Sequence, residues 1–424
     1  MSNEYSKRVA ALLYIYVEKQ EMTKKIGVIF LFVCWSVCAL AQLDSLSVAE
    51  RNALQGFNDT IDRTAEDFVT VSLVVCDPGD VLYSTLGHAA LHLQCPIFNL
   101  DYIYSYESES VRDRIWTFLR GGLKMGMFAI PTVDFLESYR ETGRGVKEYI
   151  INLSPEQEQQ LWKEMDIMAA EGLNLPYDYF SRGCAKSVVH VIHRAIGNSA
   201  IHYAPWSKKY SEHTLRELAT SFAANVPWIE FISYFLVGVE GDKAYPCEKK
   251  LIVPTDLVEV WQQATFDSGK PVLETTPNVL LDASKVHKET WLTPLLISIV
   301  LLVLAIGSLI TKWSTNRVFR ITGNVIDYVI LTIISIIGAV MTYLIFFSNL
   351  PCTTWNWLII PFNIIPLIAW HWRKYWALPW ALGLIIWIVA MVVYPHRIVD
   401  VPHLILTAAF AVVLIKQWLM AETS

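Results

Sequence analysis

Two residues of the chain have the type and the setting needed for thiol chemistry, Cys184 and His88. Cys184 begins the segment 184–196, in which apolar residues recur at helical spacing. A thiol in the first turn of a helix lies at the positive end of the helix dipole, which favours the thiolate. His88 stands at the start of an expected strand, and its near-neutral pKa suits a general base. The pair predicts a cysteine nucleophile with a histidine base; a buried core cysteine and a structural histidine are the alternatives.

The elements around these residues indicate a mixed α and β domain. The apolar, β-branched run within 65–77 predicts a strand, and 88–106 predicts a hairpin with its turn at a proline. Counting back from that turn places His88 opposite roughly Ser105. Ser105 and its neighbour Tyr106 are therefore the candidates for orienting the imidazole.

Four further polar residues are weaker candidates for substrate contacts. Asp80 lies in the turn after the first strand, and Arg182 comes two residues before the cysteine. His396 and Arg397 lie in an expected outer loop, where an arginine runs against the usual charge bias. Arg397 could contact a phosphate, with solvation at the membrane interface as the alternative.

A shared metal ion at the cysteine helix is excluded by spacing. Cys184, His190 and His193 are potential ligands. Residues 184 and 193 of one helix are more than two turns apart, too far for one tetrahedral ion. We therefore expect no metal and no other cofactor.

The N-terminus has the features of a secretory signal peptide. Lys24 and Lys25 precede the apolar run 26–33, and 39–41 reads Ala-Leu-Ala, which predicts cleavage before Gln42. Met22 is an alternative start, and an uncleaved anchor is the rival interpretation. Export would permit a disulfide, without deciding its pairing, among a set of three cysteines. These are Cys76, Cys95 and Cys247.

The composition indicates a membrane protein: 54% of the residues are hydrophobic and the mean hydropathy is +0.36. The net charge of −6, without basic blocks, excludes nucleic acid as an expected partner. We expect a signal peptide (1–41), a soluble domain (42–270), a linker (271–290) and a transmembrane domain (291–424). Five spans are expected, near 291–311, 325–347, 354–370, 376–394 and 401–419.

The loop charges orient these spans. Lysine and arginine follow the first expected span, and Arg373 and Lys374 follow the third. The positive-inside rule makes these two loops cytoplasmic and leaves the soluble domain outside. Five spans exceed what a tether needs, which suggests a path for a lipid or an apolar chain.

The order of the motifs resembles a known family. The histidine-first arrangement, Gly87-His88-Ala89-Ala90-Leu91 and later Cys184, is similar to circularly permuted papain-like enzymes of the NlpC/P60 and lecithin:retinol acyltransferase-like group. The closer resemblance is to the Lnb family, which has a periplasmic domain followed by a multi-span domain. The supporting segments are Pro78-Gly79-Asp80, Tyr177 to Cys184, Gly238 with Asp242, and Ser348-Asn349-Leu350-Pro351 before Trp355-Asn356.

The resemblance implies an α+β fold: a permuted papain-like periplasmic domain followed by a helical bundle of about five spans, in the bacterial inner membrane. It implies a lipoprotein N-acyltransferase that moves a fatty acyl chain from a phospholipid donor, through a Cys184 thioester, to a diacylated lipoprotein acceptor. The acceptor group is the α-amine of the lipidated N-terminal cysteine. Backbone N–H groups at the start of the cysteine helix would hold the oxyanion.

The chain departs from the family pattern at three places. Gly183 precedes the cysteine where the family has asparagine, Ser105 stands at another asparagine position, and Asn349-Leu350 replace an outer-loop histidine. Two alternative functions remain open. A peptidase or amidase acting on peptidoglycan would use the same pair, and a non-catalytic, membrane-tethered binding module would fit the departures.

Overall fold

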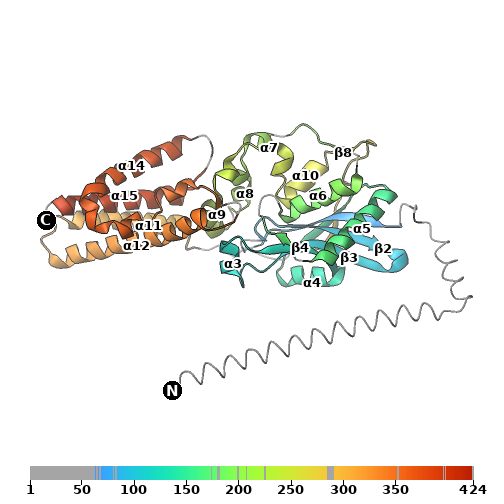
Figure 1. The fold of residues 1–424 in the computed structure, drawn as a ribbon, viewed down its shortest axis with the longest axis horizontal. Helices are drawn as coiled ribbons and strands as arrows, with labels where there is room; N and C mark the ends of the chain where they lie inside the picture. Colours follow the sequence, from blue (N-terminus) through green and yellow to red (C-terminus); the bar gives the residue numbers. More distant parts are fainter. Residues whose placement is uncertain are drawn as a thin grey trace, which may run out of the picture. The chain divides into compact units, whose positions relative to one another are not determined.

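An antiparallel sheet lies at the centre of the part of the chain that precedes the long apolar helices (Figure 1). The computed structural model describes residues 63, 65, 68–79, 81, 84–172, 174–178, 182–197, 200–206, 208–223, 226–283, 291–350, 353–394, 396 and 398–422. The expected signal peptide, Asp80, Cys352 and Arg397 lie outside these residues. Within them, seven strands pair in the order β6-β4-β3-β2-β1-β5-β9. Their bounds are β1 Thr70–Cys76, β2 His88–Cys95, β3 Leu100–Ser108, β4 Lys124–Pro131, β5 Val146–Ile150, β6 Leu175–Pro176 and β9 Asn278–Leu281.

The β2–β3 hairpin has a different register from the one expected. Ser105 pairs with Ala90, so the ladder, continued to the start of β2, puts His88 level with Glu107. The connection is a 3-10 turn, Pro96–Phe98, closed by Asn99 with a left-handed φ of 50°. This turn occupies more residues than a two-residue turn would, so the partner of His88 lies two positions further along β3 than expected.

Helices cover both faces of the sheet. Phe135 and Tyr139 of α4 pack on Val74, Ala90 and Ile103. On the other face, Tyr104 and Tyr106 of β3 contact α5. A small second sheet pairs β7 Ile201–His202 with β8 Thr265–Phe266. The helices of this part of the chain are α3 Ile115–Leu119, α4 Thr132–Glu141, α5 Pro155–Glu171, α6 Cys184–Ile196, α7 Lys208–Glu212, α8 Leu215–Ala223, α9 Pro227–Leu236 and α10 Pro254–Trp261.

Part of the expected linker belongs to the sheet. Residues 278–281 form β9, which pairs with β5, and Leu273 bridges to Ile151. The described sheet domain therefore extends beyond residue 270, at which the soluble domain was expected to end.

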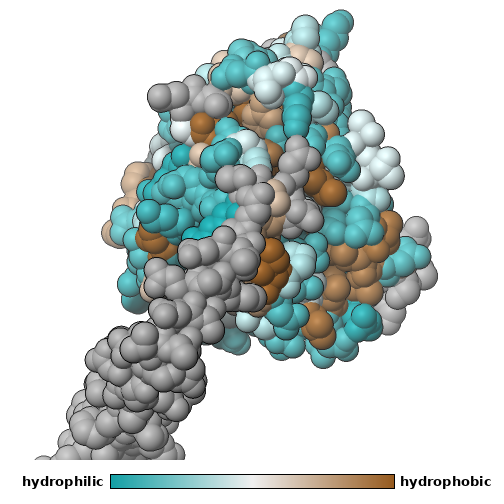
Figure 2. All heavy atoms as spheres, turned by 90° about the vertical axis from the view of Figure 1, so that its right-hand side faces the viewer, coloured by the Kyte–Doolittle hydropathy of each residue, from teal (hydrophilic) through white to brown (hydrophobic). Residues whose placement is uncertain are grey.

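Hydrophilic residues predominate on the face of the molecule shown in Figure 2, with separate hydrophobic patches between them.

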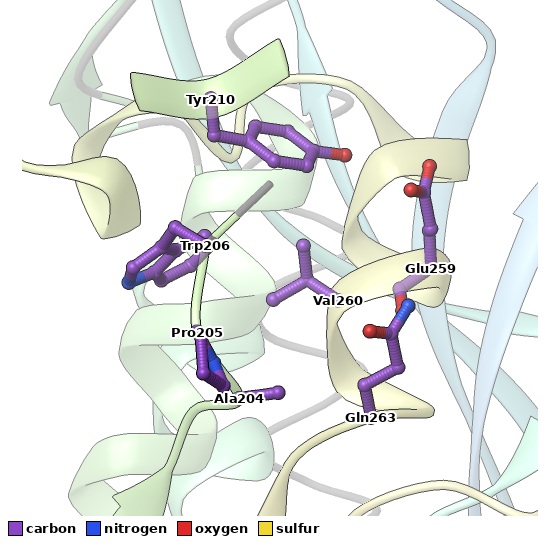
Figure 3. Close-up of a pocket in the computed structure, with 7 residues that line it drawn as sticks. All are labelled: Ala204, Pro205, Trp206, Tyr210, Glu259, Val260 and Gln263. Carbon is purple, nitrogen blue, oxygen red and sulfur yellow. The ribbon is translucent and has the colours of Figure 1, made fainter. Parts of the chain in front are cut away.

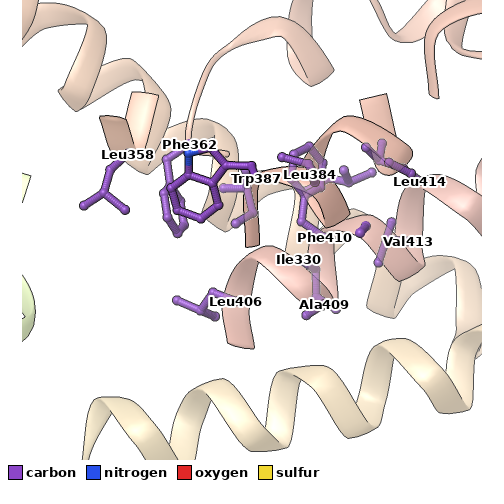
Figure 4. Packing of buried hydrophobic residues seen from close by; sticks show 14 of the residues in the cluster. Ile330, Leu358, Phe362, Leu384, Trp387, Leu406, Ala409, Phe410, Val413 and Leu414 are labelled. Atoms are coloured by element: carbon purple, nitrogen blue, oxygen red, sulfur yellow. The ribbon is translucent and has the colours of Figure 1, made fainter. Parts of the chain in front are cut away.

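The C-terminal part contains four helices, among the described residues, that are long and apolar enough to cross a membrane. They are α11 Pro294–Thr311, α12 Arg317–Phe346, α14 Arg373–Val393 and α15 Val401–Glu422. Their inward side chains form an apolar core in which Phe410 and Leu414 of α15 lie near Leu384 and Trp387 of α14 (Figure 4).

The segment 354–370, expected as a span, is not one continuous helix. It contains a 3-10 turn at Trp357–Ile359 and a single helical turn, α13, at Ile365–Ile368. Pro361 and Pro366 lack backbone N–H groups, and the Asn363 side chain bonds Ile360 and Ile365 locally. The apolar composition was correctly identified, but these residues prevent a regular helix.

This broken segment nevertheless packs along α12 in the opposite direction, from Leu344 back to Tyr328. Thr353 Oγ1 donates to the Leu344 carbonyl, and the backbone at Asn363 touches Gly338, where a Cβ would lie 2.3 Å away. The rings of Trp370 and Tyr328 are 5.7 Å apart. Residue 370 therefore lies beside the first half of α12, and α14 begins three residues later, so the basic residues 373–374 and 317–320 lie towards the same end of the helical part.

The two parts meet at the C-terminal end of α9. The Asn356 side-chain amide donates to the carbonyls of Tyr234, Phe235 and Val237 over 2.8, 3.2 and 3.0 Å. The backbone N–H of residue 239 donates to residue 355. Gly238 is needed for this approach, because a Cβ there would lie 2.7 Å from a carbonyl oxygen of the facing loop. The joint brings Gly238 into contact with the Trp355-Asn356 segment, two motifs that are more than a hundred residues apart in the sequence.

Candidate active site

Helix α6 places Cys184 at the end of the sheet where β2 begins. The helix is amphipathic, and Val188, Val191 and Ile192 bury its apolar face. Gly183 is the N-cap residue and offers no side-chain cap, so the first N–H groups of α6 are available to other acceptors. Cys184 itself is only partly buried. The sequence prediction of a helix beginning at this cysteine is confirmed.

Cys184 and His88 form a hydrogen-bonded pair with shifted ionisation. Burial would raise the pKa of Cys184, but the charge and hydrogen bond of His88, with the N–H groups of Ala89 and Ala185, lower it. Burial would lower the pKa of His88, but the charge and hydrogen bond of Cys184, together with the Glu107 charge, raise it to about 8. The two shifts favour a thiolate–imidazolium pair near neutral pH.

Ser105 and Glu107 continue the interaction beyond the imidazole. His88 Nε2 lies 2.7 Å from Ser105 Oγ, and Ser105 Oγ donates to Glu107 Oε1 over 2.6 Å. Because the serine proton goes to Glu107, Ser105 Oγ is the acceptor for Nε2–H. Because Nε2 is engaged by Ser105, we assign Nδ1 to the interaction with the Cys184 thiol.

Sequence reasoning missed Glu107. The Nε2 atom of His88 is 3.6 Å from Glu107 Oε1, so this carboxylate is the closest negative side chain to the imidazole among the described residues. The available signal was period-two alternation, since Ser105 and Glu107 are two residues apart on one strand and share a face.

Three more residues surround the pair without having been predicted to do so. Cys76 is fully buried, hydrogen-bonds Tyr139, and has a pKa raised by burial. Arg144 stacks over the Tyr139 ring at 4.6 Å and donates from Nε to the Asp77 carbonyl over 2.7 Å. The neighbourhood therefore contains one cysteine kept as a neutral thiol and one, Cys184, favoured as a thiolate.

Other predicted site residues lie elsewhere. Tyr106 points to the opposite face of β3, where its hydroxyl contacts Met168 of α5, because neighbouring strand residues alternate. It is therefore not an orienting partner of His88. Arg182 is exposed and bonds the Pro176 carbonyl over 3.1 Å. His396 faces Glu217 at 3.5 Å.

The other described cysteines form no second thiol centre or disulfide. Cys76, Cys95 and Cys247 are free thiols, so the permitted disulfide is not formed between them. No cluster of metal-ligating side chains occurs in the described part of the chain. A pocket of about 30 Å³ between Trp206, Tyr210 and α10 has room for about one water molecule (Figure 3).

Comparison with protein families agrees with this architecture. The model of the Lnb N-terminal periplasmic domain matches residues 57–220, and that of the Lnb transmembrane domain matches residues 286–422. Searches of curated proteins and of solved structures found no match. The first range contains His88, Ser105 and Cys184, and the second contains the four long helices. The chain therefore belongs to the Lnb family, as a membrane protein with a periplasmic domain and a transmembrane domain.

Proposed function

We propose that this protein is a lipoprotein N-acyltransferase of the bacterial inner membrane, with its catalytic domain in the periplasm. The observation that carries the proposal is the thiolate-favouring Cys184–His88 pair, in a domain joined by direct contacts to apolar helices. A phospholipid donor and a lipidated acceptor are both membrane molecules, so a transferase acting on them needs its nucleophile close to a bilayer.

The first half-reaction forms a thioester. The Cys184 thiolate attacks the carbonyl carbon of a phospholipid ester, and in this proposal the N–H of Cys184, in the first turn of α6, donates to the developing oxyanion. The bond from the carbonyl carbon to the glycerol oxygen breaks. His88 gives its proton to that oxygen, and a lysophospholipid leaves.

The second half-reaction transfers the acyl chain to an amine. Neutral His88 takes a proton from the α-amino group of the lipoprotein cysteine as its nitrogen attacks the thioester carbonyl. The carbon–sulfur bond breaks, an amide forms, and Cys184 returns to the thiolate beside protonated His88. Ser105 and Glu107 act as positioning residues, because they hold Nε2 and keep Nδ1 directed at sulfur.

The basic residues support the proposed orientation. Lys312, Arg317 and Arg320 follow α11, and Arg373 and Lys374 begin α14 at the same end of the helical part. Placing this end in the cytoplasm satisfies the positive-inside rule. The sheet domain, joined to the other end through Asn356, is then periplasmic.

The test uses the full chain in proteoliposomes with a phospholipid donor and a synthetic diacylated lipopeptide. We expect a lipopeptide heavier by one acyl chain with wild type, and none with Cys184→Ala. Cys247→Ala is the matched control, because this partly buried thiol contacts the Tyr210 carbonyl rather than His88. Release of free fatty acid without lipopeptide acylation would replace the transferase with a hydrolase, and equal acylation by Cys184→Ala would remove the cysteine from the chemistry.

A further inference from the structure

The connection between β3 and β4, residues 109–123, extends the catalytic strand towards the helical part; we call it the β3–β4 lip. It begins two residues after Glu107 and contains the short helix α3 at that end of the strands (Figure 1). Phe118 and Leu123 are buried against Leu350, which anchors the lip. Trp116 points away from this anchor and is 73% exposed.

The lip touches the end of a membrane helix through its backbone. The Arg120 carbonyl accepts a hydrogen bond of 3.0 Å from the Asn349 N–H, three residues after α12 ends. Gly121 has a φ of +73°, and a Cβ there would lie 2.3 Å from the Asn349 backbone. No side chain fits between these two backbone segments, so the contact fixes the position of the lip relative to the C-terminal end of α12.

Apolar side chains on both segments lie near this contact. Phe346 and Phe347 end α12 and are 63% and 71% exposed. Ile115 and Trp116 on the lip are exposed too. Of these four residues, Trp116 is of the type that concentrates where a bilayer meets water. The exposed apolar surface of the lip thus continues the membrane-facing surface of α12 past the end of the helix.

The charges of the lip and its flanking residues fit the same environment. Residues 109–124 contain four basic side chains and two acidic ones. Arg112 and Arg120 are exposed, whereas Arg114 is paired with Glu109 at 2.8 Å. Basic residues beside an exposed tryptophan match a surface of phosphate headgroups over acyl chains.

We propose that the β3–β4 lip lies in the periplasmic surface of the bilayer, with Trp116 and Ile115 among phospholipids. It contacts lipid directly beside the strand that carries Ser105 and Glu107. One further step rests on the proposed function: the lip is where a donor phospholipid leaves the bilayer plane to reach Cys184. Contact with lipid is independent of that function and can be tested without any reaction.

The experiment places the photoreactive amino acid p-benzoylphenylalanine at position 116 of the full chain in phosphatidylethanolamine–phosphatidylglycerol liposomes. Position 133 is the matched control. Val133 is also apolar and 78% exposed, but it follows β4 at Pro131, which pairs with Tyr102 at the other end of β3 from Glu107. After illumination, intact mass should reveal a phospholipid adduct at position 116 in at least about tenfold excess over position 133.

Any other result of the crosslinking experiment overturns the proposal. Equal adducts at both positions would mean non-selective labelling, and the absence of an adduct at 116 would place the lip in water. A crosslinked dimer instead would identify a second copy of the chain as the occupant. In a separate arm, Trp116→Glu should slow acylation of Cys184 by bilayer phospholipid at least about fivefold, while leaving alkylation of Cys184 by iodoacetamide unchanged. If wild type forms no acyl-enzyme, the proposed function fails while the crosslinking result stands.

Discussion

Replacing Glu107 with glutamine removes the carboxylate that faces His88 while retaining an oxygen that can accept from Ser105. Glu107 Oε1 is 3.6 Å from His88 Nε2, and the glutamate is 46% exposed, so water screens its charge. With the dielectric constant of water, a unit charge at this distance contributes about 1 kcal/mol. Its removal should therefore lower the pKa of His88 by roughly 0.8.

The sign follows from the chemistry of the first half-reaction. Acylation needs the Cys184 thiolate as nucleophile and the His88 imidazolium as acid, so the rate should fall as pH rises through the His88 pKa of about 8. Lowering that pKa in Glu107→Gln moves the alkaline limb to lower pH by the same amount. The assay is the initial rate of acyl-enzyme formation against pH, measured by quenched intact-mass spectrometry.

Glu109→Gln is the matched control for this charge change. Glu109 is the next glutamate along the chain, but it pairs with Arg114 at 2.8 Å and accepts from the Lys124 N–H. The alkaline limb of the pH–rate profile of Glu109→Gln should stay within experimental error of the wild-type limb. An unmoved limb in Glu107→Gln, or an equal displacement in both variants, would refute the assignment of Glu107 as a charge that, beside Cys184, raises the His88 pKa.

Three further predictions concern stability, each measured by thermal unfolding in detergent. Burial would lower the pKa of His92, but hydrogen bonds of 2.6 Å to each of two carboxylates raise it. The contribution of protonated His92 to the stability of the fold is therefore present below the unfolded pKa of about 6.5 and is lost as pH rises through the raised folded pKa. His92→Gln should flatten this decline of stability with rising pH. Gly238→Ala should lower the free energy of unfolding by about 1–3 kcal/mol, because the added Cβ would push the backbone of residue 238 away from the Trp355 carbonyl. A change near zero would contradict this close contact. Lys416→Met or Asp327→Ala alone should lower the free energy of unfolding by about 3–5 kcal/mol, because each variant leaves a buried charge without the partner that lies 2.8 Å away. The double variant should recover most of this stability.

Local signals in the sequence predicted the elements that carry the site. Ser154 before Pro155 is a pattern typical of a helix start, and the structure has a complete capping box there with Gln157. The start of α6 at Cys184 and the strand beginning at His88 were equally local, because each depends on a few neighbouring residues and on hydrophobic periodicity.

Features that depend on distant residues were not predicted. The register of β2 on β3 is set by the geometry of a 3-10 turn, so the relation of Glu107 to His88 was missed. Residues 278–281 resemble a linker until they pair with β5, more than a hundred residues earlier. The broken segment 354–370 is apolar enough for a span, but its prolines and asparagines decide its conformation once it packs on α12.

The most direct test of the central claim is the intact mass of the full-length protein after incubation with phospholipid alone. Wild type should gain the mass of one acyl chain, hydroxylamine should remove it as expected for a thioester, and Cys184→Ala should gain nothing. His88→Ala should form the adduct at least about a hundredfold more slowly. An unmodified wild-type protein whose Cys184 still reacts with iodoacetamide, or an adduct that persists in Cys184→Ala, would contradict the account.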